Sequence, residues 1–196
     1  MTSPVAPSFY HPAPRAQQFC SQCGHPLSHE IPPEDNRIRD LCKHCGAVHY
    51  QNPRNVVGVV PIWGDQVLLC RRAIEPRYGK WTLPAGFMEL GETTEQGAAR
   101  ENQEESGVRI RIQSLITVID VPSVNQVHLY YLAEVLSPEL APGPETLEAS
   151  FFKLDAIPWQ ELSFRSVSTT LEHYLQDRPT GQFPTHHYSI DLRFPD

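Results

Sequence analysis

Residues 86–108 constrain this chain most, because they place Glu101, Glu104 and Glu105 close together on a predicted helix. The helix follows a loop that contains glycine and is expected to end at Gly107. Residues three and four apart share one face of a helix, so the three carboxylates would repel one another unless cations neutralised them. Carboxylate oxygens are ligands of hard cations. The pattern therefore predicts a Mg²⁺ or Mn²⁺ site with hydrolytic chemistry.

The segment resembles the signature of the Nudix hydrolases, G-x5-E-x7-R-E-U-x-E-E-x-G-U, in which U is a bulky aliphatic residue. The matching positions are Gly86, Glu92, Arg100, Glu101, Glu104, Glu105, Gly107 and Val108. Asn102 departs from the signature, because the family usually has an aliphatic residue there that packs the helix. The resemblance implies an α/β fold, a Nudix α/β/α sandwich with a mixed sheet, and hydrolysis of a nucleoside diphosphate that is linked to another group.

The resemblance also assigns roles to these positions. It implies that Glu101 and Glu105 bind the catalytic cations directly and that Glu104 assists them. The carbonyl of Ala85 commonly completes the coordination in this family. Arg100 can hold one carboxylate of the cluster through paired hydrogen bonds, so the catalytic set comprises Arg100, Glu104 and Glu105 together with a general base.

The general base is expected on a loop outside the helix. Glu148 and Glu145 precede a predicted strand at 151–154, where similar family members place theirs, and Glu148 is preferred. Either carboxylate could instead be a further metal ligand or an ordinary loop residue.

Several cationic and aromatic residues lie on segments that should flank the cleft. The candidate phosphate contacts are Arg54, Arg71, Arg72 and Lys80. Tyr78 and Phe87 are candidates for stacking on a ring of the substrate, whereas Trp81 is expected in the core.

Four cysteines form the pairs Cys20/Cys23 and Cys42/Cys45, a spacing typical of a zinc site. Four thiolates around Zn²⁺ close the tetrahedron, so this metal would be structural. Disulfides are the competing interpretation, which the lack of a secretory signal disfavours. We therefore predict a zinc ribbon at 18–50 that folds with the help of its metal. A DNA-reading role is disfavoured because the segment lacks a dense Lys/Arg face.

Around these motifs the chain divides into further segments. We predict a disordered leader at 1–17, a Nudix hydrolase domain at 51–178 and a C-terminal tail at 179–196. Within the domain we expect a hairpin of strands 56–63 and 66–71, a helix ending near 106, strands at 108–119, 126–136 and 151–154, and an amphipathic helix at 162–177.

Composition limits the partners and the location. The net charge of −7 makes nucleic-acid binding unlikely, since that normally needs a basic face. No apolar run approaches the roughly 20 residues of a membrane span, and the leader lacks the apolar segment of a secretory signal. We therefore expect a cytoplasmic protein with a small nucleotide substrate and no membrane partner. The resemblance favours a homodimer.

Within the Nudix hydrolases, the chain is most similar to the zinc-ribbon FAD/ADP-ribose pyrophosphatases. The similarity runs from Phe19 to about Asp177 and includes residues 141–145, Ala-Pro-Gly-Pro-Glu. It implies cleavage of FAD to FMN and AMP, or of ADP-ribose to ribose 5-phosphate and AMP. NAD(H) pyrophosphatases carry a Ser-Gln-Pro-Trp-Pro-Phe-Pro-type motif, which residues 120–127 of this chain do not match. That branch is therefore disfavoured and is kept as an alternative. A non-catalytic nucleotide sensor that uses the ribbon is another.

Overall fold

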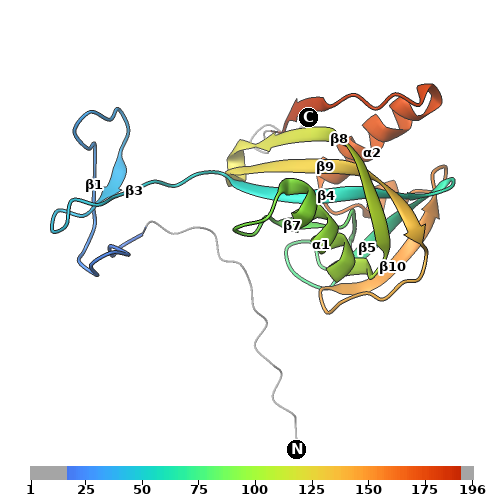
Figure 1. Cartoon of the computed structure of the whole chain (residues 1–196), viewed down its shortest axis with the longest axis horizontal. Coiled ribbons are helices and arrows are strands. Elements are labelled where there is room, and N and C mark those ends of the chain that lie inside the picture. The colour runs from blue at the N-terminus through green and yellow to red at the C-terminus, as the bar shows by residue number, and fades with distance from the viewer. Residues whose placement is uncertain (1–16, 191–196) are drawn as a thin grey trace, which may run out of the picture. The chain divides into compact units, whose positions relative to one another are not determined.

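The computed structural model describes residues 17–190, and contacts divide the chain between Asn52 and Pro53 into two units (Figure 1). Most of the predicted leader, residues 1–16, and the end of the predicted tail, residues 191–196, lie outside the described residues. Within the described part of the chain, no helix has the length and apolarity that crossing a membrane would need.

The first unit is a small antiparallel sheet with two cysteine-containing turns. Its strands are β1 (Ser28–Glu30), β2 (Arg39–Leu41) and β3 (Val48–His49), in the order β1-β2-β3. In each turn a glycine N–H donates to a cysteine carbonyl at 2.8 Å, from Gly24 to Cys20 and from Gly46 to Cys42. The two cysteine pairs therefore sit on equivalent turns.

The second unit is built on an eight-stranded mixed sheet. Its strands are β4 (Arg54–Trp63), β5 (Gln66–Arg72), β6 (Trp81–Thr82), β7 (Ala85–Phe87), β8 (Arg109–Val121), β9 (Gln126–Ser137), β10 (Thr146–Lys153) and β11 (His186–Ser189). The order is β10-β5-β4-β9-β8-β11, with β6 on β5 and β7 on β4. The β4–β9 and β8–β11 pairs are parallel and the others are antiparallel.

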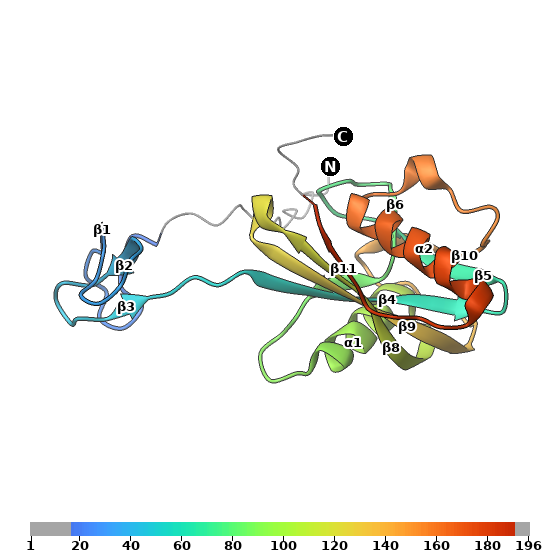
Figure 2. The ribbon, with the colours of Figure 1, turned by 90° about the horizontal axis from the view of Figure 1, so that it is seen from above.

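Two helices cover opposite faces of this sheet (Figure 2). They are α1 (Thr94–Ser106) and α2 (Arg165–Asp177), and the short 3-10 helices are η1 (Pro122–Val124), η2 (Trp159–Glu161) and η3 (Arg178–Thr180). Adjacent strand residues point to opposite faces. Val59 accordingly packs with Ala98 of α1, whereas Val60 packs with Val167 of α2. The predicted α/β/α sandwich is confirmed.

Polar bonds determine both ends of α1. A capping box begins it: the Thr93 hydroxyl accepts the Gln96 N–H at 3.2 Å, and the Gln96 side chain accepts the Thr93 N–H at 2.8 Å. At the other end, the fully buried Asn102 side chain donates to the Val108 carbonyl at 2.6 Å. Asn102 therefore holds the chain as it leaves the helix, where the family usually has aliphatic packing.

Some predicted segment boundaries were wrong. The helix expected at 162–177 begins at Arg165, because Phe164 has an extended backbone and cannot form a helical turn. The strand expected at 151–154 begins at Thr146, since residues along its length pair with β5. The predicted tail contains β11, a parallel partner of β8. The residues of this edge strand, His-His-Tyr-Ser, are mostly polar and gave no apolar signal.

Candidate active site

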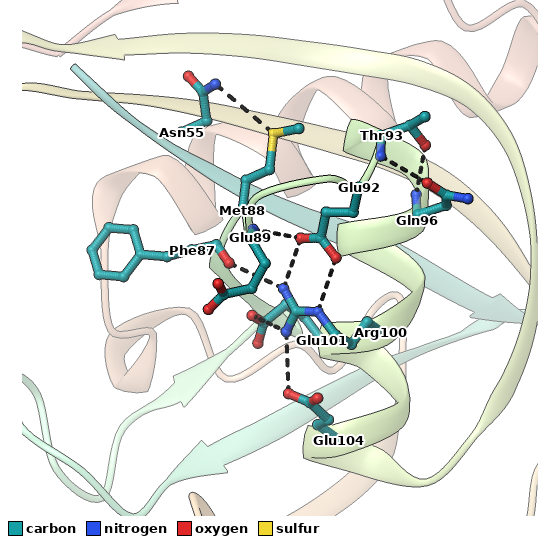
Figure 3. Close-up of polar contacts among 10 residues, drawn as sticks. All are labelled: Asn55, Phe87, Met88, Glu89, Glu92, Thr93, Gln96, Arg100, Glu101 and Glu104. Carbon is teal, nitrogen blue, oxygen red and sulfur yellow. Dashed lines mark hydrogen bonds and ion pairs between the residues drawn. The ribbon is translucent and has the colours of Figure 1, made fainter. Parts of the chain in front are cut away.

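The guanidinium of Arg100 organises the acidic cluster (Figure 3). It donates to Glu92 at 2.9 and 3.0 Å, to Glu101 at 2.7 Å, to Glu104 at 3.2 Å and to the Phe87 carbonyl at 3.1 Å. A guanidinium has five N–H donors, so all of them have an acceptor here. Glu92 first, and then Glu101, raises the pKa of Arg100, which therefore stays charged.

Glu105 is the most buried carboxylate of the cluster, with 9% exposure. Its Oε2 accepts the N–H of Ala85 at 3.2 Å. Burial, and then the negative charge of Glu101, raises the pKa of Glu105 to about 8. Burial also raises the pKa of Glu101, although Arg100 acts in the opposite direction. Two carboxylates whose charge is this unfavourable form a site that a cation would stabilise.

A close approach between α1 and β7 brings these groups to the sheet. A Cβ atom on Gly86 would overlap the carboxylate of Glu101, so a larger residue here would displace that carboxylate from its place in the cluster. Ala85, just before it, lies beside Glu105 through its N–H. The absence of a side chain at Gly86 therefore lets the helix carboxylates reach the backbone of strand β7.

The donors of this cluster fit a divalent cation that prefers oxygen. Glu101, Glu104 and Glu105 offer carboxylate oxygens, and Ala85 offers a backbone carbonyl. Glu104 has a side-chain exposure of 59% and is free to turn toward an ion. One oxygen of Glu104 and one of Glu101 accept from Arg100, which leaves the second oxygen of each carboxylate to meet a cation.

Of the two candidate bases, Glu145 is electrostatically linked to the cluster. Its charge contributes, after burial and nearer carboxylates, to the raised pKa values of Glu101 and Glu105. The loop before it docks on the end of α1, where the Ala141 N–H donates to the Ser106 carbonyl at 2.8 Å. Glu148 is 53% exposed and pairs with Arg71 at 3.7 Å.

Of the cationic residues predicted to contact phosphate, some lie near the acidic cluster and others lie away from it. Arg72 has its guanidinium 5.1 Å from the Phe164 ring centre and interacts electrostatically with Glu105. Burial lowers the pKa of Arg72 although the nearby carboxylates oppose this. The Lys80 ammonium instead contacts the carbonyl of Gln160 at 3.4 Å.

The two aromatic residues predicted to stack on the substrate also differ in their distance from the acidic cluster. The guanidinium of Arg54 lies 4.4 Å from the ring centre of Phe87, whose carbonyl accepts from Arg100. These three residues therefore form one group beside the acidic cluster. Tyr78 is 58% exposed in the loop between β5 and β6, which also holds the Gly79 carbonyl that accepts from Arg71.

The four cysteines of the first unit form a second site. Their sulfur atoms all lie within 4.8 Å of one another, and the Cys20–Cys45 and Cys23–Cys42 separations are 3.6 and 3.4 Å. A tetrahedron with metal–sulfur bonds of about 2.3 Å has edges of about 3.8 Å, so the arrangement fits Zn²⁺. Among the described residues, this is the one group of His, Cys, Asp or Glu side chains gathered this tightly.

Histidines surround this site without replacing a thiolate. His49 Nε2 lies 3.3 Å from the sulfur of Cys20. Burial alone would raise the pKa of Cys20, but the N–H of Gln22 and the His49 ring lower it to about 6. His25 and His44 stack on each other with ring centres 3.6 Å apart. The surroundings of Cys20 thus favour the thiolate that a metal requires.

Comparison with known families decides the classification. A model described as the NUDIX domain matches residues 52–171, and one described as Nudix N-terminal, a zinc ribbon, matches residues 18–51. The chain belongs to the Nudix family. The resemblance seen in residues 86–108 is thereby confirmed, and the protein is a Nudix hydrolase.

Individual relatives show what this Nudix hydrolase is similar to. The NAD-capped RNA hydrolase NudC proteins of Salmonella heidelberg (strain SL476) and Salmonella typhi are each 34% identical over 145 residues, which are 74% of this chain and 54% of theirs. The chain thus spans about half the length of these curated relatives. A NUDIX hydrolase from Nitrosomonas europaea is 44% identical with a TM-score of 0.86, over 89% of this chain and 99% of that one. An ADP-ribose pyrophosphatase from Streptococcus suis 89-1591 shares the fold, with a TM-score of 0.56. It is 20% identical, over 71% of this chain and 100% of that one.

The structure also reveals polar residues on β9 of the Nudix domain that the sequence analysis did not identify. Gln126, His128 and Tyr130 alternate along this strand, so they share one face of the sheet. His128 bonds to Ser166 of α2 at 3.1 Å. Polar residues at every second position of an otherwise apolar strand are a signal that could have found them.

Proposed function

We propose that this Nudix hydrolase cleaves the pyrophosphate bond of ADP-ribose or FAD in a reaction that requires Mg²⁺ or Mn²⁺. The products would be AMP and either ribose 5-phosphate or FMN. The observation that carries the proposal is the pair formed by the half-buried Glu101 and the buried Glu105, whose pKa values are both raised and whose negative charge needs a cation. The choice of substrate depends on the resemblance of residues 141–145, which dock on the end of α1.

The residues of the cluster have separate roles in this proposal. Glu101, Glu104 and Glu105 would hold the cations together with the carbonyl of Ala85. Bound cations neutralise a diphosphate and acidify the water that attacks it. Arg100 keeps Glu101 in place through a bond of 2.7 Å.

Positive side chains would bind the rest of the diphosphate. Arg54 is exposed beside Phe87, and Arg72 lies within the electrostatic reach of Glu105. Arg71 and Lys80 remain candidates whose observed contacts are with Glu148 and with the Gln160 carbonyl. Tyr78 would contribute only if its loop turned toward the substrate.

For the general base we favour Glu145 over Glu148. Glu145 affects the pKa values of the buried carboxylates, whereas Glu148 lies in a cross-strand pair with Arg71. A base contributes about 10²- to 10⁴-fold to a rate. Glu145→Gln should therefore lower kcat by that amount while Glu148→Gln leaves it within a few-fold of the unmodified protein. The opposite result would assign the base to Glu148.

A substrate panel tests the activity. The full chain is incubated with Mg²⁺ or Mn²⁺ and with FAD, ADP-ribose, NADH or a deoxynucleoside triphosphate, and the release of AMP or phosphate is measured. Glu105→Gln should lower turnover of the best substrate about 10³-fold or more, since it removes a charged ligand from the buried site. Glu95→Gln is the matched control, because Glu95 is exposed in the first turn of the same helix.

Two alternatives have their own outcomes in this panel. The 34% identity to proteins named NAD-capped RNA hydrolase favours an NAD(H) pyrophosphatase, and preferential cleavage of NADH would support it. Tight binding of one compound without turnover would support a nucleotide sensor. In all cases we expect Zn²⁺ in the ribbon and a dimer, which metal analysis and light scattering would measure.

A further inference from the structure

A group of partly or fully exposed residues lies on the face of the sheet that α2 covers, beyond the beginning of that helix. The strand register places Arg54 beside Gln126. It places Val56 between His128 on β9 and Phe87 on β7. Directly opposed residues on neighbouring strands share a face. We call these five residues, Arg54, Val56, Phe87, Gln126 and His128, the His128 patch.

The helix α2 leaves this patch partly open. Val56 is on the same face as Val60, which is fully buried against Val167. At the patch, by contrast, Val56, Phe87, Gln126 and His128 all remain partly exposed and Arg54 is exposed. Ser166, in the first turn of α2, is the residue that reaches His128. The side chains of Val56 and Phe87 are therefore only partly covered next to a fixed imidazole.

Hydrogen bonds hold the polar members of the patch in place. His128 Nδ1 lies 3.1 Å from the Ser166 hydroxyl, and its Nε2 lies 2.9 Å from Oε1 of Gln126. The amide nitrogen of Gln126 has no partner among the described residues 17–190. It has two N–H donors to offer a ligand. Burial lowers the pKa of His128 to about 4, so the ring is neutral near pH 7.

The His128 patch is continuous with the acidic cluster through β7. Ala85 donates its N–H to Glu105, and the carbonyl of Phe87 accepts from Arg100. The Phe87 side chain belongs to the patch, and Arg54 lies against its ring. A molecule whose diphosphate lies at the carboxylates can thus extend along β7 onto the patch.

We propose that the His128 patch binds the neutral purine base of the substrate, with Gln126 donating a hydrogen bond to the ring. This inference depends on the proposed function as a nucleoside diphosphate hydrolase. The chemistry matches a base better than a phosphate, because Phe87 offers an aromatic ring, Val56 offers an apolar side chain, and the Gln126–His128 pair is uncharged. Arg54, the one cation of the patch, lies on the Phe87 ring and can cover a bound base.

Two probes that differ only by the base test this assignment. AMP and ribose 5-phosphate are compared as inhibitors of the Mg²⁺-loaded full chain and of Gln126→Ala. Loss of one hydrogen bond should weaken inhibition by AMP about 3- to 10-fold and leave inhibition by ribose 5-phosphate unchanged. Gln113→Ala, an exposed glutamine on β8, is the matched control. Equal weakening for both probes, or no change for either, would overturn the proposal.

A second measurement separates this proposal from the proposed function. Adenosine, which has no phosphate, is titrated into the full chain while the side-chain amide signals of Gln126 and Gln113 are followed by NMR. We expect a shift at Gln126 and none at Gln113. That shift supports the patch even if no dinucleotide is hydrolysed. Hydrolysis of ADP-ribose without any shift at Gln126 would leave the activity intact and refute the patch.

Discussion

Glu92 and Arg100 are joined by two hydrogen bonds, 3.0 Å from Nε to Oε2 and 2.9 Å from Nη2 to Oε1. Glu92 also accepts the N–H of Glu89 at 2.7 Å. Arg100 first, and then that N–H, lowers the pKa of Glu92, so the carboxylate stays charged. One side chain thereby links the loop before α1 to the guanidinium that holds Glu101.

Glu92→Gln should weaken this link without changing the size of the side chain. Because Arg100 would be held less firmly, we expect kcat to fall about 10- to 100-fold and the Mg²⁺ concentration for half-maximal rate to rise. Steady-state rates across a Mg²⁺ titration measure both, with Glu95→Gln as the control on the same helix. An unchanged Mg²⁺ dependence would show that Glu92 does not act through Arg100.

Asn102→Leu restores the family's aliphatic residue, yet we expect it to destabilise the protein. The substitution leaves the Val108 carbonyl without the 2.6 Å bond from Asn102, in a place where water has no access. The cost should be about 1 to 3 kcal/mol in the free energy of unfolding. Urea denaturation measures it. Greater stability in the leucine variant would mean that packing outweighs the hydrogen bond here.

Much of this site was predictable because its residues lie along one helix. Spacing alone places Glu101, Glu104 and Glu105 on a shared face. The contact between Glu92 and Arg100 requires the loop to fold back on the helix, which spacing does not reveal. The burial of Asn102 depends on where the chain turns after Gly107.

In the fold, too, local patterns were predictable and contacts between distant segments were not. The pattern of apolar runs on either side of the Gly64–Asp65 turn predicted the hairpin, which Ile62 and Val67 join in register. It missed β11, because a polar edge strand derives its stability from pairing with β8. Which of Glu145 and Glu148 is the better candidate for the general base likewise depends on a loop that docks on α1. The sequence motif does not predict that contact.

The neutral state of His128 should make stability depend on pH. Its pKa is about 4 in the folded protein against about 6.5 when unfolded, so between these values the unfolded chain binds more protons. Stability therefore rises with pH across this window and is lost as the pH falls through it. Relative to His128→Gln, the unmodified protein should lose about 2 kcal/mol between pH 7.5 and 5. Urea unfolding of both proteins measures this change. An equal difference in their free energies of unfolding at pH 7.5 and at pH 5 would contradict the prediction.

Gly143→Ala tests whether the docked loop positions Glu145. A Cβ atom at Gly143 would overlap the backbone carbonyl of Glu104, so the loop must move. We expect kcat to fall about 10-fold or more, since a small misplacement of a catalytic group is costly. In the Gly143→Ala, Glu145→Gln double variant the two losses should not add. Additive losses would mean that the glycine acts independently of Glu145.

Removal of the ribbon metal should loosen residues 18–50 and leave hydrolysis largely intact. The two units divide between Asn52 and Pro53, and the acidic cluster lies wholly in the second. After chelation, the NMR amide signals around Cys20 and Cys42 should broaden or shift. The kcat in excess Mg²⁺ should change less than about 3-fold, because a structural zinc mainly supplies folding energy to its own unit. Loss of activity together with the metal would make the ribbon part of the catalytic unit.

The pairing of β11 with β8 has a practical meaning for the handling of this protein. Residues 186–189 satisfy backbone groups of residues 117–120 that would otherwise form a bare sheet edge. Open edges recruit strands from other molecules. A shortened chain that stops before His186 should accordingly self-associate during expression and storage, even though its hydrolytic centre is untouched.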